Sequence, residues 1–108
     1  MKRGTIVTIS APGDYGKPRP AVVVQSDALN TADGVLVALF TSVITDAPLY
    51  RLTIAPTPIN GLESVSQVMV DKILAYPRAE CGPVMGQLSA AEILVLNTML
   101  SVMIGLAG

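Results

Sequence analysis

Histidine is absent from this chain, and cysteine occurs once, as Cys81. A structural zinc site needs about four Cys, His or carboxylate ligands, and no spacing here offers them. Without histidine, a Ser-His-Asp triad and a histidine-based acid/base nuclease are both excluded. One cysteine also excludes an internal disulfide, and we interpret Cys81 as a small residue in a turn. We therefore expect no metal and no cofactor.

Charged residues are scarce as well, at 14% of the chain, whereas 51% of the residues are hydrophobic. Soluble domains typically contain about 25% charged residues. The length of 108 residues suits a single domain, residues 1–108, with one core. A monomer this small has difficulty burying so much apolar surface, so we expect a homodimer or a bound partner.

No apolar run is long enough to span a membrane, which takes roughly 20 residues. The N-terminus, Met1-Lys2-Arg3-Gly4-Thr5, lacks the apolar core of a signal peptide. We therefore expect no membrane association and a cytoplasmic location.

The formal charge is −1, which gives no global electrostatic argument for nucleic-acid binding. A polyanion site would have to be local. It would be built from some of the seven basic side chains, which are Lys2, Arg3, Lys17, Arg19, Arg51, Lys72 and Arg78.

Short β runs fill the first three quarters of the chain. We predict strands over Thr5–Ser10, Pro20–Ser26, Val35–Phe40, Leu49–Ile54 and Ser64–Leu74, with a short sixth over Ala75–Arg78. The connections are too short for parallel crossovers, which favours antiparallel pairing. The pattern predicts a mainly β fold, a small and strongly bent sheet or barrel, with a helix after it.

The C-terminal segment changes to a helical pattern. Ser89 is followed three residues later by Glu92, which is the spacing of a capping box. We predict a helix from there to about Ile104, with Gly105 as the stop. Apolar residues cover nearly all of its surface, so it should pack on the sheet and also meet a second subunit or a partner. The alternative is a core helix in a tight monomer.

Arg19 lies between Pro18 and Pro20 at the start of an apolar strand. Each proline fixes its own φ and pushes the preceding residue toward extended geometry. A guanidinium on such a rigid backbone can bind a phosphate or a carboxylate through two of its nitrogens. The alternative is a stiff strand entry whose arginine forms a surface ion pair.

Thr41, followed by Ser42, ends another apolar strand. A hydroxyl at the end of such a strand often faces a cleft and needs a hydrogen-bond partner. The alternative is that Thr41 only bonds a neighbouring backbone group in a turn.

Four ordered segments resemble the motifs of the PemK/MazF toxins. They are Lys17-Pro18-Arg19-Pro20-Ala21-Val22-Val23-Val24, Leu39-Phe40-Thr41-Ser42, Gly61-Leu62-Glu63-Ser64 and Val70-Asp71-Lys72-Ile73. The corresponding family motifs are an Arg-Pro-Ala-Val-Val strand, a Thr-Ser strand end, a Gly-Leu-x-x-x-Ser turn and an Asp-Gln-Ile strand. The resemblance covers essentially the whole chain.

This resemblance implies an SH3-like barrel with a C-terminal helix, the fold shared by the CcdB, MazF and PemK toxins. It implies a dimeric toxin of a type II toxin–antitoxin system that cleaves single-stranded RNA at short sequences without a metal. The functional arginine of the family falls on Arg19 and its functional threonine on Thr41. The cognate antitoxin would bind across the dimer and block the RNA groove.

A ribonuclease without histidine or metal must use the substrate's own 2′-hydroxyl as nucleophile and stabilise a negatively charged phosphorane. Arg19 would donate two hydrogen bonds to that phosphate and Thr41 a third. The base remains open between Asp14, Tyr15 and a water held by Thr41. The donor of a proton to the leaving oxygen is unassigned.

The loop before the arginine, Ala11 to Lys17, is shorter than in many family members, whose loop carries a polar pair. Lys72 stands where glutamine is common, and it either touches RNA phosphate or is a solvated strand charge. As substrate-binding residues we predict Asp14, Tyr15, Lys17, Ser42 and Lys72.

Two other functions are compatible with the same fold. One is a gyrase poison like CcdB, although the Trp-Gly-Ile ending of CcdB is absent and the chain has no tryptophan. The other is a catalytically weak homologue that only binds its antitoxin, which the short loop before Arg19 suggests.

Overall fold

The computed structural model describes residues 1–10, 16–29 and 32–107. Within these residues, six strands form one antiparallel sheet in the order β4-β5-β3-β2-β1-β6. The strands are β1 (Thr5–Ile9), β2 (Arg19–Val23), β3 (Gly34–Thr41), β4 (Arg51–Ile54), β5 (Ser66–Pro77) and β6 (Val84–Gln87). The helix α1 (Ala90–Met103) follows, and two short 3₁₀ turns, η1 (Asp27–Leu29) and η2 (Arg78–Glu80), lie in connections. The predicted mainly β fold with a C-terminal helix is confirmed.

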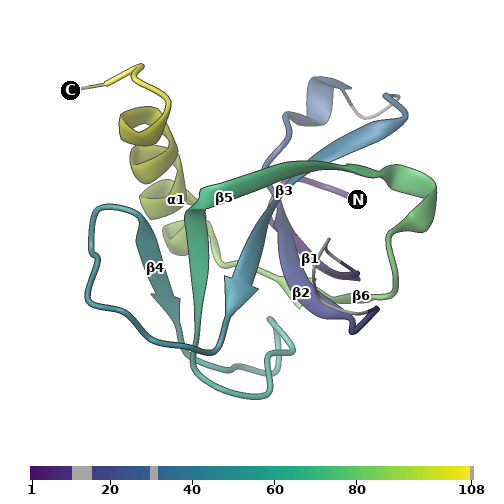
Figure 1. Cartoon of the computed structure of the whole chain (residues 1–108), viewed down its shortest axis with the longest axis horizontal. Coiled ribbons are helices and arrows are strands. Elements are labelled where there is room, and N and C mark those ends of the chain that lie inside the picture. Colours follow the sequence, from purple (N-terminus) through teal and green to yellow (C-terminus); the bar gives the residue numbers. More distant parts are fainter. Residues whose placement is uncertain (11–15, 30–31, 108) are drawn as a thin grey trace.

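The sheet curls because its longest strand bends. Figure 1 shows β5 turning sharply near its middle. Its first residues, Ser66–Met69, pair with β4, while its later residues pair with the beginning of β3. A register shift between Ala38 and Phe40 of β3 accompanies the bend. The chain then returns through η2 to place β6 against β1, so the sheet becomes an open barrel (Figure 1).

Alternate residues of the central strands enter two separate cores. Val22 and Ala38 belong to the core that includes α1, whereas Ala21, Val37 and Leu39 belong to the core on the opposite face. Successive side chains of a strand point to opposite faces. Burial on both faces therefore explains why β3 reads as a continuous apolar run instead of alternating.

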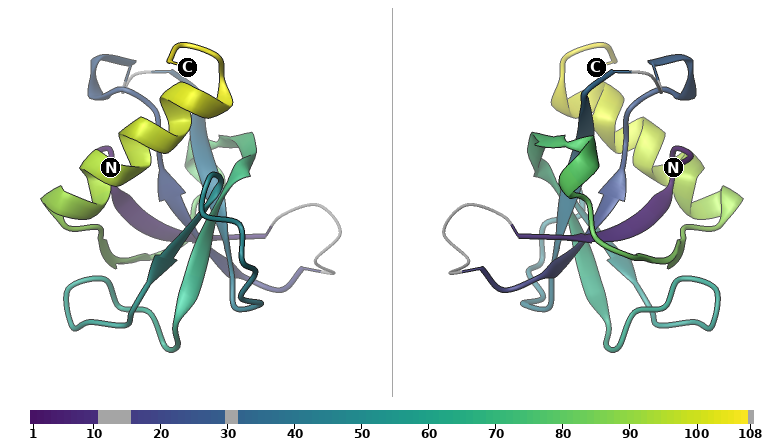
Figure 2. Two further views of the ribbon diagram at one scale, coloured as in Figure 1. Left: turned by 90° about the vertical axis from the view of Figure 1, so that its left-hand side faces the viewer. Right: turned by 90° about the vertical axis from the view of Figure 1, so that its right-hand side faces the viewer.

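The helix begins where the capping box predicted. The Ser89 side chain accepts a hydrogen bond from the backbone N–H of Glu92 (3.1 Å), and the Glu92 carboxylate accepts one from the backbone N–H of Ser89 (2.8 Å). Leu96, Met99 and Leu100 are buried against the sheet. Figure 2 shows α1 lying along one side of the sheet, with much of its length facing outward. No helix in the described part of the chain has the length and apolar character needed to cross a membrane.

The predicted sixth strand over Ala75–Arg78 is wrong. Ala75–Pro77 completes β5, and Arg78 begins the turn η2. The prediction ended β5 early because Asp71 and Lys72 interrupt its apolar pattern, but both side chains are exposed on the strand. The actual sixth strand, β6, is short and contains Gly86, so its sequence carried little strand signal.

A loop spanning residues 55–62 packs closely on β6. The backbone N–H of Gln87 donates to the carbonyl oxygen of Ile59 (3.1 Å). A Cβ atom at Gly86 would overlap that same carbonyl oxygen and the backbone of Asn60. Glycine at position 86 is therefore required by the close approach of two backbones.

Gly86→Ala should destabilise the protein by about 1–3 kcal/mol, because rigid backbone atoms would have to move apart. Gly34→Ala is the matched control, since a Cβ there meets nothing nearer than the Tyr76 carbonyl oxygen at 3.9 Å. Urea unfolding of both variants measures the difference. Equal stabilities would contradict the close packing of the loop on β6.

Candidate functional site

Arg19 and Thr41 meet because of the register between β2 and β3. Ala21 pairs with Leu39, and Val22 with Ala38. Continuing this antiparallel register by two residues sets Arg19, the first residue of β2, across from Thr41, the last residue of β3. Directly opposed residues of an antiparallel pair point to the same face. Two residues that are 22 positions apart in the sequence therefore lie at one end of the sheet.

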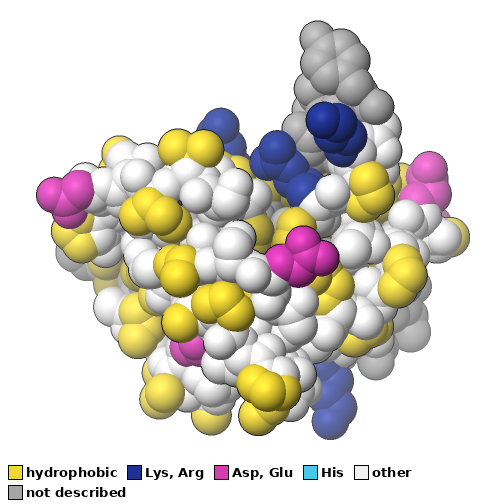
Figure 3. Space-filling view, turned by 90° about the horizontal axis from the view of Figure 1, so that it is seen from below, with side chains coloured by type: hydrophobic (Ala, Val, Ile, Leu, Met, Phe, Trp, Pro, Cys, Tyr) yellow, Lys and Arg dark blue, Asp and Glu magenta, His cyan; other side chains and the backbone are white. Residues whose placement is uncertain are grey.

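A cleft of about 460 Å³ opens at this end. Its walls come from the beginning of β2, the end of β3 with the loop after it, and the turn before β5. The lining residues are Thr8, Pro18, Arg19, Pro20, Phe40, Thr41, Ser42, Val43, Leu62, Glu63, Ser64, Ser66 and Met85. Among these described residues, only Arg19 and Glu63 carry a charge. Figure 3 views the molecule from this side and shows basic side chains gathered in one region, with an acidic side chain near them.

The Thr41 hydroxyl has a defined orientation. Its Oγ1 accepts a hydrogen bond from the backbone N–H of Val43 (3.1 Å). The local turn bond that was the alternative interpretation of Thr41 is thus present. A hydroxyl can accept and donate at the same time, so this bond leaves its O–H proton able to serve a ligand in the cleft. The local bond and a functional role are compatible.

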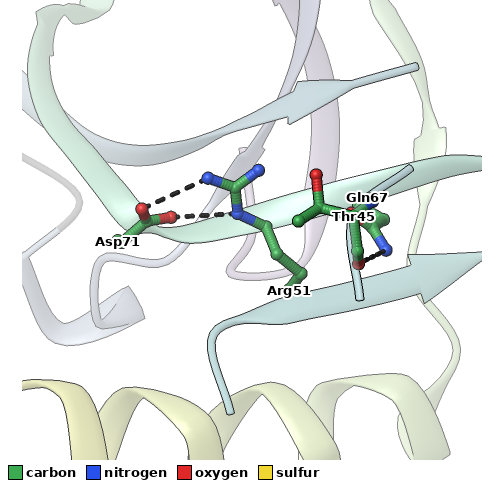
Figure 4. A network of polar contacts seen from close by, with 4 residues as sticks. All are labelled: Thr45, Arg51, Gln67 and Asp71. Carbon is green, nitrogen blue, oxygen red and sulfur yellow. Dashed lines mark hydrogen bonds and ion pairs between the residues drawn. The ribbon is translucent and has the colours of Figure 1, made fainter. Parts of the chain in front are cut away.

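The three other arginines, Arg3, Arg51 and Arg78, are tied into the fold by contacts with other residues. The Arg3 guanidinium donates to the Val24 carbonyl oxygen and to Asn97, and Arg78 donates to the Ala32 carbonyl oxygen. Arg51 forms a two-bond ion pair with Asp71, with N–O distances of 3.2 and 3.3 Å (Figure 4). Arg19 is the arginine among the described residues that line the cleft.

The predicted substrate-binding residues divide into three groups. Ser42 lines the cleft beside Thr41. Lys17 and Lys72 are exposed, but neither is among the lining residues. Asp14 and Tyr15 lie outside the described residues.

Gln67 fixes the wall that follows Thr41. Its buried side chain accepts from the backbone N–H of Thr45 (3.0 Å) and donates to the carbonyl oxygen of the same residue (2.9 Å). Figure 4 shows the Gln67 amide lying against Thr45. It also donates to the hydroxyl of Thr53 on β4 (3.1 Å). The amide therefore acts as a substitute strand partner for Thr45 and holds the segment after β3 against β5.

Asn60 fixes the opposite wall. Its buried Oδ1 accepts from the backbone N–H groups of Thr57 and Leu62, both at 3.0 Å. Its Nδ2 donates to the Ala55 carbonyl oxygen (2.8 Å). One side chain thus organises the loop that leads into Leu62, Glu63 and Ser64 at the cleft.

Cys81 lies outside the cleft. It follows η2, where Sγ is 3.8 Å from the Pro77 carbonyl oxygen. Partial burial raises the pKa of the thiol, although the positive charges of Arg78 and of the N-terminus act in the opposite direction. The thiol is therefore protonated near neutral pH and is a poor nucleophile. This fits its interpretation as a small loop residue.

A comparison with protein families matches residues 2–104 to the PemK-like, MazF-like toxins of type II toxin–antitoxin systems. The chain belongs to this family. It is also 41% identical over 109 residues to "Probable endoribonuclease MazF" of Mycolicibacterium smegmatis, and the match covers 100% of both chains. The resemblance inferred from the four sequence motifs is thereby confirmed.

Solved structures of other toxins share the fold of this family member. An endoribonuclease from a mycobacterial species, solved in complex with its cognate antitoxin, superposes with a TM-score of 0.83 at 22% identity, covering 100% of this chain and 98% of that one. The Mycobacterium tuberculosis toxin MazF-mt6 gives a TM-score of 0.82 at 20% identity, covering 96% and 99%. MazF in a MazE–MazF complex from Deinococcus radiodurans gives 0.75 at 20% identity, covering 97% and 95%.

Sequence reasoning missed the residues that hold the walls of the cleft in place. Gln67 and Asn60 are polar residues in or beside apolar runs. Their side chains are only 3% and 1% exposed, and this burial, which marks them as structural hydrogen-bonding residues, is known only from the fold. Glu63 appeared in the sequence only as part of a turn motif. Its position in the cleft depends on the docking of the 55–62 loop on β6.

Gln67→Leu should release the wall after Thr41. The substitution keeps the side-chain bulk but leaves the Thr45 N–H and C=O without their partner, which should cost about 1–3 kcal/mol. Thr53→Val is the matched control, because it removes one bond to Gln67 and leaves the two to Thr45. Hydrogen exchange at the Thr45 amide should accelerate in Gln67→Leu alone. An unchanged exchange rate would show that other contacts hold this segment.

Proposed function

We propose that this member of a family of toxin endoribonucleases cleaves single-stranded RNA at its cleft, without a metal, by attack of the substrate's own 2′-hydroxyl. The observation that carries the proposal is the pairing of a proline-flanked guanidinium, Arg19, with an oriented hydroxyl, Thr41, at the mouth of one cleft. A cognate antitoxin, the partner of toxins of this family, would occlude the same cleft. The site of action is the cytoplasm, where messenger RNA is accessible.

In this reaction the 2′-oxygen attacks the adjacent phosphorus while a base takes its proton. The bond from phosphorus to the 5′-oxygen breaks, and that oxygen takes up a proton. The products are a 2′,3′-cyclic phosphate and a 5′-hydroxyl. The protein has to orient the phosphate and stabilise the charge that accumulates on its oxygens.

Arg19 and Thr41 are suited to that task from opposite strands. The guanidinium donates two parallel hydrogen bonds to phosphate oxygens, and the Thr41 O–H donates a third. Because neither group must be deprotonated to act, stabilisation of charge is the main contribution of this pair. The candidates for the base are Asp14, Tyr15 and a water held by Thr41, and the donor of the proton to the leaving oxygen is unassigned.

Single-stranded RNA fits the shape and chemistry of the cleft. Unstacked bases present edges and faces that a narrow protein cleft can contact. The lining of the cleft contains both polar and apolar residues, among them Ser42, Ser64 and Ser66 and also Phe40 and Met85. An RNA in the cleft could therefore make both polar and apolar contacts. Phe40 is almost fully buried, and it forms part of the floor of the cleft.

Arg19→Ala and Thr41→Val should each lower cleavage of a single-stranded RNA, measured in excess chelator. Removing one donor to a developing oxyanion typically costs about 10²–10³-fold in rate. Arg19→Lys should restore little, because an ammonium cannot form the two parallel bonds. Lys2→Ala removes the same charge from an exposed position outside the cleft and should leave the rate unchanged. Undiminished cleavage by Arg19→Ala would remove Arg19 from the mechanism.

We also propose that the protein acts as a homodimer that uses the outer face of α1. Leu94, Val95, Val102 and Ile104 of this segment are exposed, with Val95 at 49% and Leu94 at 67%. An apolar groove of about 340 Å³ runs between Val95 and Val102 of the helix and Leu49 of the β3–β4 connection. Exposed apolar faces of this kind mark interaction surfaces in small soluble proteins.

The double variant Val95→Glu, Val102→Glu should be monomeric by sedimentation velocity, because four charges would face one another across a two-fold interface. Ile59→Glu is the control: it makes the same change at an exposed apolar residue in a loop away from α1. A double variant that keeps the mass of the wild-type dimer would place the interface elsewhere.

A further inference from the structure

The cleft contains a carboxylate, Glu63, to which the proposed mechanism assigns no role. We propose that Glu63 reads the Watson–Crick edge of a guanine next to the scissile phosphate and so determines the sequence that is cut. The inference rests on the proposed ribonuclease function, and it assigns the side chain that gives that function its sequence preference.

Glu63 is held on a stiff backbone. The residue before it, Leu62, is buried, and its backbone N–H donates to the Asn60 side chain (3.0 Å). The carbonyl oxygen of the residue after it, Ser64, accepts from the hydroxyl of buried Ser66 (2.9 Å). The Glu63 side chain itself is exposed at the cleft, and the anchors on both sides fix the position of its backbone. A fixed backbone lowers the entropy lost when the side chain binds a ligand.

The loop that carries Glu63 is itself fixed to the sheet. Gly61 adopts φ = 69°, and a Cβ there would overlap the Met85 carbonyl oxygen of β6. The Gln87 N–H binds Ile59 on the same loop. The wall around Glu63 is therefore part of the scaffold, which is the setting that specific recognition needs.

Electrostatics argue against an RNA phosphate as the partner of Glu63. A carboxylate repels a phosphate, and within the described part of the chain Glu63 has no ion-pair partner that would neutralise it. Its favourable partners on an RNA strand are the N–H donors of the bases. Arg19 and Glu63, on different walls of the cleft, would therefore contact different parts of the RNA. The RNA phosphate would bind the guanidinium, and a base would bind the carboxylate.

Guanine is the base whose donors match a carboxylate. Its Watson–Crick edge presents N1–H and N2–H side by side, and these fit the two oxygens of one carboxylate. Cytosine and adenine each present one amino group beside a ring acceptor, and uracil presents one N–H between two carbonyl oxygens, so all three place an acceptor against the negative charge. The Watson–Crick edge is accessible in single-stranded RNA. Discrimination by such a paired contact amounts to about 10- to 100-fold.

The test couples a change in the protein to a change in the RNA. Cut sites of the wild type are first mapped on a long RNA. Two short RNAs that contain one of these sites are then made. One keeps the guanine nearest the cut, and the other has inosine in its place. Inosine lacks the N2 amino group and keeps the rest of the base. Cleavage efficiency (kcat/KM) and equilibrium binding are measured for the wild type, for Glu63→Gln and for Glu80→Gln.

Glu80→Gln is the matched control, because it makes the same charge change on an exposed residue of η2, outside the cleft. We expect the wild type and Glu80→Gln to favour the guanine RNA by about 10- to 100-fold. Glu63→Gln should reduce that ratio to about threefold or less, because its amide opposes a donor to the guanine edge.

Four results would overturn the inference while leaving the ribonuclease intact. They are mapped sites without a guanine, equal cleavage of both RNAs by the wild type, an unchanged ratio in Glu63→Gln, and an equal loss of kcat on both RNAs. The last of these would make Glu63 an acid or base instead of a reader. If the wild type cuts no site on the long RNA, the proposed function fails, and equilibrium binding of a guanine-containing short RNA and of its inosine-substituted copy decides. A guanine preference that is lost only in Glu63→Gln supports the inference, and the absence of that preference refutes it.

Discussion

The antiparallel pairing of β2 with β3 is the constraint on which the site depends. The paired residues contribute to the cores on both faces of the sheet. Val22 and Ala38 pack into one core, and Ala21 and Leu39 pack into the other. The same register brings Arg19 level with Thr41. A slip of one residue would send every side chain of a strand to the opposite face, so the packing of the core also protects the alignment of the site.

The two walls of the cleft are held by buried amides instead of by additional strands. Gln67 gives Thr45 the hydrogen bonds that a neighbouring strand would have given, and Asn60 does the same for the turn before Leu62. A buried polar group costs free energy unless all its bonds are made. These two residues therefore hold loops rigidly while leaving the end of the sheet open to a ligand.

The sequence predicted those parts of the fold that depend on local chemistry. The start of the helix followed from Ser89 and Glu92, and the apolar β3 followed from its composition. The boundary of β5 and the identity of β6 were wrong, because a strand that bends can expose a charged pair such as Asp71-Lys72 midway and because Gly86 is selected by the packing of a distant loop.

For the site, the sequence singled out Arg19 from its two prolines and Thr41 from its place at a strand end. It did not show that they face one another, since this depends on register. Lys17 and Lys72 were proposed for substrate binding from their charge and from motif position, and the cleft lining does not include them. Glu63 was hidden because an acidic residue in a turn is normally a solvated one. Its relevance appears only when the walls of the cleft are assembled.

The proposed mechanism depends on the cleft positioning an RNA phosphate for attack by the neighbouring 2′-hydroxyl. A short RNA containing one mapped cut site can be compared with the same RNA carrying a single 2′-deoxynucleotide immediately 5′ of the scissile phosphate. Attack by the 2′-hydroxyl predicts that the modified RNA binds as tightly as the unmodified one but is not cut. Cleavage of both RNAs at the same rate would contradict it, because the nucleophile would then have to come from water or from the protein.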